Sequence, residues 1–263
     1  MNLAFALERN ACIKPDAVAV RFRDRSYTYR QINEETNRYA NLMSHFGVGK
    51  GDRVCIWLPN GLEFIYSFFG ILKLGALAVP MNDLFKEREA LYILRNSGSK
   101  LLITSKKKLS IVEEIYDQLP DLKTVAVTEN VTHKNPHVFP IEKSLENKNV
   151  TRTAKELSPD HGACILYTSG TTGDPKGVEL SHYNLTTNAE FYADCIELTE
   201  QHYGCIVTPL SQLLVLMAGL ILIFIKGGKF YLFEKFHTKD VAAKIHEENI
   251  NFFIGVPAMY YMF

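Results

Sequence analysis

Residues 167–182 read YTSGTTGDPKGVELSH, a stretch rich in glycine and hydroxyl residues. It follows an apolar, strand-like segment at residues 163–167 (ACILY) and runs through consecutive hydroxyl and glycine residues before Pro175, Lys176 and Gly177. Glycines let backbone N–H groups point into a common concavity, hydroxyl groups add donors, and a lysine adds a positive charge. The stretch therefore has the chemistry of a phosphate-binding loop, with a flexible polar turn as the alternative.

Two common phosphate-binding motifs do not fit this loop. A P-loop counted from Gly170 would need a second glycine at Pro175 and a serine or threonine at Gly177. A dinucleotide fingerprint needs G-x-G-x-x-G at the start of a helix, whereas Gly170 and Gly173 are three residues apart and a short strand follows them. The sequence therefore argues against a P-loop kinase and against a Rossmann-type dinucleotide site.

The rest of the chain alternates strand-like and helix-like segments, which predicts an α/β fold with largely parallel sheets flanked by helices. A long polar connection at residues 128–160 interrupts this alternation. We therefore expect two β/α sub-lobes, residues 1–158 and residues 159–263, with the loop in the second. The expected strands are residues 17–23, 53–58, 76–80, 100–104, 122–127, 163–167, 178–180, 205–208, 229–233 and 251–255. The expected helices are residues 29–46, 62–74, 86–98, 111–119, 213–225 and 239–249, and one that begins at His182 with Ser181 as its cap.

The loop resembles the signature of the adenylate-forming (AMP-binding) superfamily, in the branch of acyl-CoA synthetases, or fatty-acid–CoA ligases. YTSGTTGDPKGVELSHYNL matches that signature almost position by position. Further stretches look like the family's corresponding segments: YTYRQINEETNRYANLM (27–43), GVGKGDRVCIWLPNGLEF (47–64), LKLGALAVPMN (72–82) and GVPAMYYMF (255–263). The resemblance thus runs along the whole chain and predicts the amino-terminal portion of such an enzyme.

The resemblance implies a ligase of fatty acid and lipid metabolism that uses ATP, Mg²⁺ and coenzyme A. A small carboxylic acid would attack the α-phosphate of ATP to give an acyl-adenylate, and the thiol of coenzyme A would then take the acyl group. Lys176 would supply a counter-charge near the phosphates. The residues that would wrap the β- and γ-phosphates are Thr168, Ser169, Gly170, Thr171, Thr172 and Gly173.

The acyl pocket follows the family less closely. After Pro209 the family usually continues with an aromatic residue and a histidine, but this chain continues with Leu210, Ser211 and Gln212. Ser211 and Gln212 are therefore the candidates for the acyl or adenylate pocket by position. The resemblance favours a fatty or other organic acid and leaves the particular acid open.

The chain ends at Phe263 in an apolar, helix-like segment without a cap or a polar tail. Family members continue with an acidic residue that helps to hold Mg²⁺, an aspartate that binds ribose, and a mobile carboxy-terminal domain that carries a lysine. We therefore expect no complete catalytic set and no metal site in these residues, and no activity of the chain alone. The expected partners are a complementary carboxy-terminal polypeptide or a second copy of the chain. A non-catalytic remnant, or a module that binds nucleotide or pyrophosphate, is the alternative.

Composition limits the other classes of function. Lys plus Arg and Asp plus Glu number 29 each in 263 residues, so no net charge favours nucleic acid as a partner. The 5 cysteines form no C-x-x-C pair, which argues against a zinc site and for a reducing cytoplasm: Cys12, Cys55, Cys164, Cys195 and Cys205. The uncharged run at residues 213–225 would rise only about 20 Å as a helix, short of a bilayer core of roughly 30 Å. We therefore expect a buried helix there and no membrane span.

Overall fold

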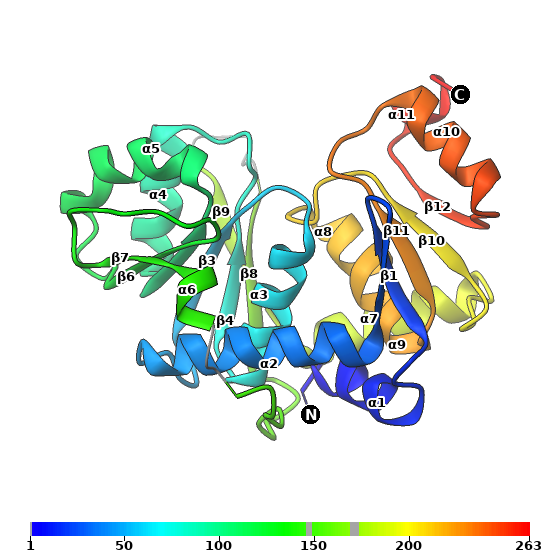
Figure 1. The fold of residues 1–263 in the computed structure, drawn as a ribbon, viewed down its shortest axis with the longest axis horizontal. Helices are drawn as coiled ribbons and strands as arrows, with labels where there is room; N and C mark the ends of the chain where they lie inside the picture. Colours follow the sequence, from blue (N-terminus) through cyan, green and yellow to red (C-terminus); the bar gives the residue numbers. More distant parts are fainter. Residues whose placement is uncertain (1, 146–148, 169–173) are drawn as a thin grey trace.

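The computed structural model describes residues 2–145, 149–168 and 174–263, and in these ranges the strands form two sheets (Figure 1). The larger sheet has 7 strands in the order β7-β6-β5-β3-β4-β8-β9, and the smaller has 5 in the order β12-β10-β11-β1-β2. Neighbouring strands are parallel except β8 with β9 and β1 with β2. The strands of the larger sheet are β3 (Arg53–Trp57), β4 (Leu77–Pro80), β5 (Leu101–Thr104), β6 (Thr124–Val127), β7 (Val138–Pro140), β8 (Gly162–Thr168) and β9 (Lys176–Ser181). Those of the smaller sheet are β1 (Val18–Phe22), β2 (Arg25–Thr28), β10 (Tyr203–Ile206), β11 (Lys229–Leu232) and β12 (Phe252–Ile254).

Helices cover both sheets and also fill the space between them (Figure 1). They are α1 (Phe5–Ile13), α2 (Tyr29–His45), α3 (Leu62–Lys73), α4 (Glu87–Ser97), α5 (Leu109–Ile115), α6 (Ile141–Leu145), α7 (His182–Cys195), α8 (Leu213–Val215), α9 (Leu222–Lys226), α10 (Thr238–Glu247) and α11 (Pro257–Tyr260). Short 3-10 turns η1 (Lys106–Lys108) and η2 (Tyr116–Gln118) flank α5, and the π-helical segment η3 (Leu216–Ile221) joins α8 to α9. The predicted α/β fold with parallel sheets and flanking helices is therefore confirmed.

Alternate side chains along a strand of the larger sheet point to opposite faces and pack in different layers of the molecule. In β3, Val54 and Ile56 belong to the core between the sheets, whereas Cys55 and Trp57 pack with α4 and α5 on the outer face. Both sets are buried, since a parallel sheet covered on both faces needs apolar residues at every position. On the outer face of the smaller sheet, Val241 of α10 packs against the strands.

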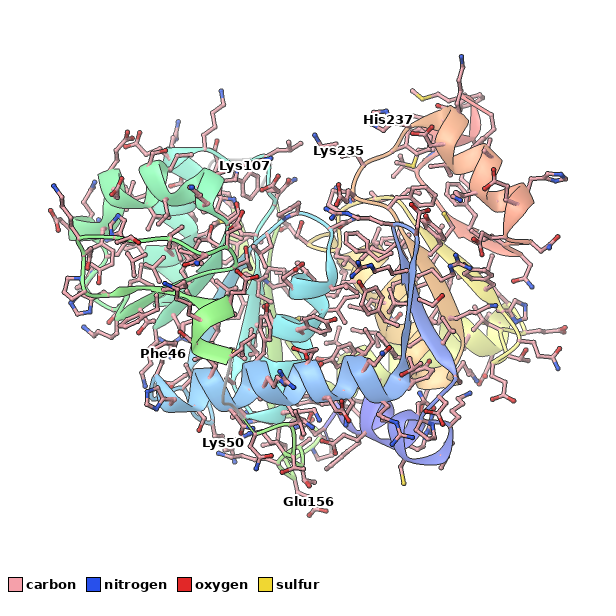
Figure 2. The ribbon with its side chains drawn as sticks, in the orientation of Figure 1. Phe46, Lys50, Lys107, Glu156, Lys235 and His237 are labelled. Atoms are coloured by element: carbon pink, nitrogen blue, oxygen red, sulfur yellow. The ribbon has the colours of Figure 1, made fainter. Side chains whose placement is uncertain are left out.

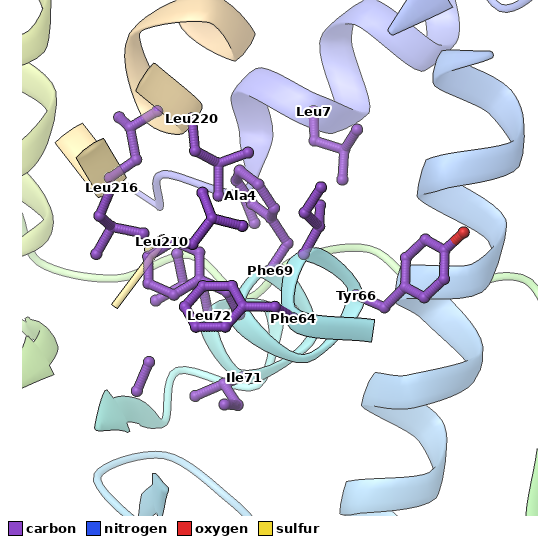
Figure 3. Packing of buried hydrophobic residues seen from close by; sticks show 14 of the residues in the cluster. Ala4, Leu7, Phe64, Tyr66, Phe69, Ile71, Leu72, Leu210, Leu216 and Leu220 are labelled. Carbon is purple, nitrogen blue, oxygen red and sulfur yellow. The ribbon is translucent and has the colours of Figure 1, made fainter. Parts of the chain in front are cut away.

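Aromatic rings connect the central helices to the smaller sheet. Phe69 of α3 meets Phe224 of α9 with ring centroids 5.1 Å apart, and Phe224 meets Phe230 of β11 at 5.8 Å. Both pairs are edge-to-face, the arrangement that aromatic quadrupoles favour. Figure 3 shows Phe64 and Phe69 of α3 beside Leu216 and Leu220 from the second half of the chain. One core therefore joins segments that are far apart in the sequence.

A buried ammonium group connects three helices at the other side of this core. Nζ of Lys73, in α3, lies 2.6 Å from Oε1 of Glu8 in α1, and it donates to Oδ1 of Asn33 at 2.8 Å and Oδ1 of Asn37 at 2.7 Å in α2. Burial lowers the pKa of Lys73, and the contact with Glu8 opposes that change. Oε1 of Glu8 also accepts the backbone N–H of Ala154 at 2.8 Å. The cluster thus fixes α1 and the later connecting segment against α2 and α3.

Most predicted elements occur within two residues of their expected ends, but the polar connection does not lack structure. It contains β7, whose Val138 pairs with Val125 of β6, and the helix α6. A strand that short carries too few residues for a periodic pattern, and backbone pairing with β6 decides it. The expected buried helix at residues 213–225 is helical and extends to Lys226, but Leu213 and Leu214 are exposed and burial begins at Val215.

The expected sub-lobes, residues 1–158 and residues 159–263, do not coincide with the two sheets. β1 pairs with β11, as in the parallel pair Val20 and Phe230, so an early strand lies in the sheet of the second half. β8 pairs with β4 at Ala78 and Cys164, so the strand before the loop belongs to the sheet of the first half. The order of segments along the chain does not reveal such long-range pairing.

No helix in the described ranges is long and apolar enough to cross a membrane. Near the last described residue a group of apolar side chains is exposed: Tyr260, Tyr261, Met262 and Phe263. Self-association through these side chains stays a prediction.

His182 differs from a solvated residue at the start of a helix, which would be the ordinary expectation for its position. It is 0% exposed, and its Nδ1 accepts the backbone N–H of Leu3 at 3.1 Å. Its ring stacks on His161 with centroids 6.2 Å apart, and its Nε2 has no partner in the described part of the chain. Burial, with a smaller effect from His161, lowers the pKa of His182 to about 4.

We predict that acid destabilises the fold through His182. In the unfolded chain the pKa of a histidine is about 6.5, so the folded state resists protonation and loses stability as pH falls from about 6.5 towards 4. The full difference corresponds to about 3 kcal/mol. Urea unfolding between pH 7 and pH 4.5 measures it. His182→Gln should flatten this dependence, whereas His246→Gln, at an exposed position in α10, should leave it unchanged. Equal slopes for all three proteins would contradict the assignment.

Candidate functional site

The predicted phosphate loop lies between two paired strands. β8 and β9 are antiparallel, with Tyr167 opposite Gly177 and Thr168 opposite Lys176. Both Thr168 and Lys176 are exposed. Ser169, Gly170, Thr171, Thr172 and Gly173 lie outside the described residues. The structure therefore places the two ends of the predicted loop, and brings the hydroxyl-bearing Thr168 and the cationic Lys176 to facing positions.

Lys176 is available to an anion. No other described residue forms an ion pair or hydrogen bond with its ammonium group, while Asp174 nearby lies 3.9 Å from Arg88 of α4. That pair is exposed on both sides, so water screens it. A lysine that has no carboxylate partner suits a phosphate group, which would supply the missing negative charge.

The described residues do not form a metal site. Within residues 2–145, 149–168 and 174–263, no 3 His, Cys, Asp or Glu side chains come together in a way that could hold a metal ion. Mg²⁺ keeps several waters and commonly binds through phosphate oxygens with only one or two carboxylates. The donors present, a hydroxyl and an ammonium group, suit phosphate rather than the ion itself.

The second half of the candidate site lies where β10 ends. Ser211 and Gln212 follow this strand, and the backbone N–H of Gln212 donates to the carbonyl of Pro209 at 3.0 Å, which forms a turn before α8. Ser211 is half-buried and Gln212 is exposed. Leu210, in the region where the family usually has an aromatic residue and a histidine, is 1% exposed and belongs to the core. The structure thus leaves Ser211 and Gln212 near a surface, and their contact with a substrate stays a prediction.

The carboxyl ends of the parallel strands lie at one edge of the molecule, the upper edge in Figure 1. Figure 2 shows Lys107, which follows β5, and Lys235 and His237, which follow β11, at this same edge. Lys50 and Glu156 lie at the opposite edge. In open α/β sheets, ligands bind outside the carboxyl ends of the strands, so this edge is where a ligand is expected.

Asn60 joins the two sheets at this edge, a role that was not predicted from the sequence. Its Nδ2 donates to the carbonyls of Thr208 and Phe233 at 3.0 Å each, after β10 and β11. Its Oδ1 accepts the backbone N–H of Leu210 at 2.8 Å. Asn60 is 7% exposed, and its bonds to Thr208 and Leu210 are buried. The turn-forming sequence Pro59-Asn60-Gly61 after an apolar strand was the available signal, but it identifies a turn and not the partners.

Comparisons with known proteins identify a family for this sequence. The family model described as AMP-binding enzyme matches residues 7–263. Crotonobetaine/carnitine–CoA ligases of Escherichia coli are similar, one of them 32% identical over 235 residues, or 89% of this chain and 46% of the relative. A crotonobetaine/carnitine–CoA ligase of Escherichia fergusonii is also 32% identical over the same length.

Two solved structures extend the likeness to the fold. The anthranilate CoA ligase AuaEII, in complex with anthranoyl-AMP, superposes with a TM-score of 0.93 at 28% identity and covers 100% of this chain. The N-terminal domain of FACL13 from Mycobacterium tuberculosis superposes with a TM-score of 0.89 at 28% identity. This chain covers 51% of the first structure and 64% of the second.

The chain therefore belongs to the AMP-binding enzyme family, whose model spans nearly all of it. It resembles the acyl-CoA ligases of that family in sequence and in fold, as the resemblance in residues 167–182 predicted. The chain spans about half the length of the curated relatives it matches.

We predict that Asn60→Ala lowers the free energy of unfolding of the protein. The change would leave the N–H of Leu210 and the carbonyls of Thr208 and Phe233 without their buried partner, and one such loss typically costs about 1–3 kcal/mol. Urea unfolding should show this loss. Asn188→Ala, at an exposed position in α7, is the matched control and should change the free energy of unfolding by less than about 0.5 kcal/mol. Equal stability of both variants would show that the three bonds contribute little.

Proposed function

We propose that this chain is the amino-terminal part of an ATP-dependent acyl-CoA synthetase. A carboxylate oxygen of the acid would attack the α-phosphorus of ATP, and the bond to pyrophosphate would break, which gives the acyl-adenylate. The thiol of coenzyme A would then attack the acyl carbon and release AMP. The observation that supports this most is the β8–β9 hairpin, which brings Thr168 opposite Lys176, a lysine with no ion-pair partner among the described residues, at the ends of the family's signature stretch.

The chemical contribution of these residues is electrostatic. Negative charge grows on the oxygens of the leaving pyrophosphate, and donors already in place stabilise it more in the transition state than in the ground state. By resemblance, the hydroxyl and backbone groups of residues 168–173 would supply the donors, and Lys176 would supply the positive charge. Mg²⁺, when bound with ATP, would neutralise further phosphate charge.

The acid is proposed only as a class. The similar proteins are named for crotonobetaine or carnitine, for anthranilate and, in a fatty acyl CoA synthetase of Mycobacterium tuberculosis, for fatty acyl groups. All of these acids carry a carboxylate, and the betaines, the aromatic acid and the fatty acids otherwise belong to different chemical classes. A fatty or other organic acid therefore remains the proposed substrate, with Ser211 and Gln212 as candidates for the wall of its pocket.

A second candidate function is a module that binds nucleotide or pyrophosphate without catalysis. Thr168 and Lys176 support it, because they are exposed at facing positions of the hairpin and offer donors for phosphate whether or not catalysis follows. Either function predicts phosphate binding, and only the enzyme part predicts recovery of activity with a complementary polypeptide.

We predict that Mg-ATP or Mg-pyrophosphate stabilises the protein and that Lys176→Ala weakens this effect. A ligand at 100 times its Kd stabilises the fold by about 2.7 kcal/mol, and a tenfold loss of affinity would halve that value to about 1.4 kcal/mol. Thermal unfolding with increasing ligand measures both. Thr171→Ala should act in the same direction.

The matched control is Lys50→Ala, which removes an exposed lysine at the opposite edge of the molecule (Figure 2). It should leave the ligand effect intact. An equal effect in the wild type and in both loop variants would show that the nucleotide binds elsewhere, and no stabilisation at all would contradict both proposed functions.

We predict that this chain alone does not make acyl-adenylate. The reaction needs an aligned carboxylate and groups that meet the charge between the phosphates, and in the family these come partly from beyond the matched portion. ATP–pyrophosphate exchange with short, medium and long fatty acids should stay at background. Addition of a polypeptide with the carboxy-terminal portion that the relatives have should raise it. Strong exchange by the chain alone, lost in Lys176→Ala, would overturn this expectation.

A further inference from the structure

One face of α4 contacts the β8–β9 hairpin at the end of its strands next to the loop. Arg88, Tyr92 and Asn96 are spaced four residues apart, so they lie on the same side of the helix. Arg88 lies 3.9 Å from Asp174, and the ring of Tyr92 meets the ring of Tyr167 edge-on with centroids 6.4 Å apart. Asn96 completes the face, because its Oδ1 accepts the phenol O–H of Tyr167 at 2.6 Å. Two of the three α4 residues therefore contact a single side chain of the hairpin.

On its other side, the Tyr167 ring packs against a glycine. Gly177 is its partner across the two strands, and a Cβ at Gly177 would lie 3.1 Å from Cζ and 3.3 Å from Cε1 of the Tyr167 ring. The same Cβ would lie 3.1 Å from Cγ2 of Ile165. The ring thus lies against the bare backbone of β9, where any larger residue would displace it. The glycine that follows Lys176 consequently has a packing role besides any role in the loop.

The contacts of this face differ in strength. The Arg88–Asp174 pair has side chains 89% and 61% exposed, and such pairs contribute little. Tyr167 is half-buried, and burial raises its pKa to about 12, so the phenol is protonated and donates at neutral pH. The bond from Tyr167 to Asn96 is therefore the contact that fixes the ring, with Tyr92 limiting its tilt.

Holding Tyr167 also fixes its neighbour in the strand. Successive side chains of a strand point to opposite faces, so a fixed Tyr167 ring sets the rotation of the strand at Thr168. Thr168 pairs with Lys176, and the two groups proposed to meet the phosphates are next to the two residues of the Tyr167–Gly177 pair. A small rotation here would move a donor and a charge relative to each other, and precise placement governs electrostatic stabilisation.

We propose that Tyr167, held over Gly177 by Asn96 and Tyr92, is a positioning residue for phosphate binding. This inference rests on the proposed function, since it concerns the same phosphate ligand. Tyr167 does not touch the phosphate; it acts through the placement of Thr168 and Lys176. The competing explanation is that the contact only adds to the stability of the hairpin.

The test is a double-mutant cycle on affinity for Mg-pyrophosphate, measured by isothermal titration calorimetry with the full chain. Tyr167→Phe removes the donor and Asn96→Ala removes the acceptor, and each should weaken binding about 3- to 10-fold, the size expected for one hydrogen bond. Because both changes remove the same bond, the double variant should bind no more weakly than either single variant. Gly177→Ala, which displaces the ring, should weaken binding further.

The readout that separates positioning from stability is the melting temperature without ligand. The bond is exposed and lies in a hairpin with six residue pairs, so Tyr167→Phe should shift the Tm by less than about 2 °C. Tyr116→Phe is the matched control, because its O–H donates to the carbonyl of Leu122 at 3.4 Å in another part of the larger sheet's outer face. It should leave the affinity unchanged.

The outcomes distinguish this inference from the function on which it rests. Wild-type binding that is lost in Lys176→Ala but unchanged in Tyr167→Phe and Asn96→Ala would overturn the positioning role alone. Additive losses in the double variant, or losses that follow the Tm, would leave only a structural role and also overturn it. A wild-type chain that binds no pyrophosphate would overturn the proposed function and the positioning role together.

Discussion

The arrangement of the molecule depends on α3, which is buried between the two sheets. All of its residues except Glu63 are buried. A helix that is apolar all round must be enclosed on every side, and here α2, the seven-stranded sheet and the segment from α8 to α9 enclose it. Gly70 lets α2 approach closely, since a Cβ there would lie 3.2 Å from the backbone N of Ala40. The two sheets therefore share one core, and neither half of the chain completes it alone.

The same helix determines how the early part of the chain is held. Lys73, at its last turn, carries a charge that burial disfavours, and Glu8, Asn33 and Asn37 satisfy it. Removing one partner of such a buried pair costs far more than the pair adds, because the other group is left uncompensated. The main effect of the cluster is therefore to favour one packing of α1 against α2 and α3, and its contribution to net stability is smaller.

At the edge formed by the carboxyl ends of the strands, the packing of the core sets the positions of the groups that a ligand would meet. Asn60 joins the ends of β10 and β11 to the turn before α3, so the shared core also fixes the distance between the two sheets where a ligand is expected. The hairpin that carries Thr168 and Lys176 is attached to the larger sheet through β4 and to α4 through Tyr167. A ligand at this edge would therefore meet groups that two different sheets hold in place.

The sequence by itself determined most of the local elements and the α/β class, and it predicts the chemistry of the loop. Apolar runs located β3 and α3, a helical period located α2, and the glycine, hydroxyl and lysine residues of the loop are readable because their chemistry is local. Only the tertiary structure decided that β1 joins the second sheet, that β8 joins the first, and that His182 is buried. It likewise decided the partners of Asn60 and Tyr167, which come from residues far away along the chain. These features depend on backbone pairing and packing between distant segments, and no pattern within a short window of sequence encodes which segment becomes the neighbour.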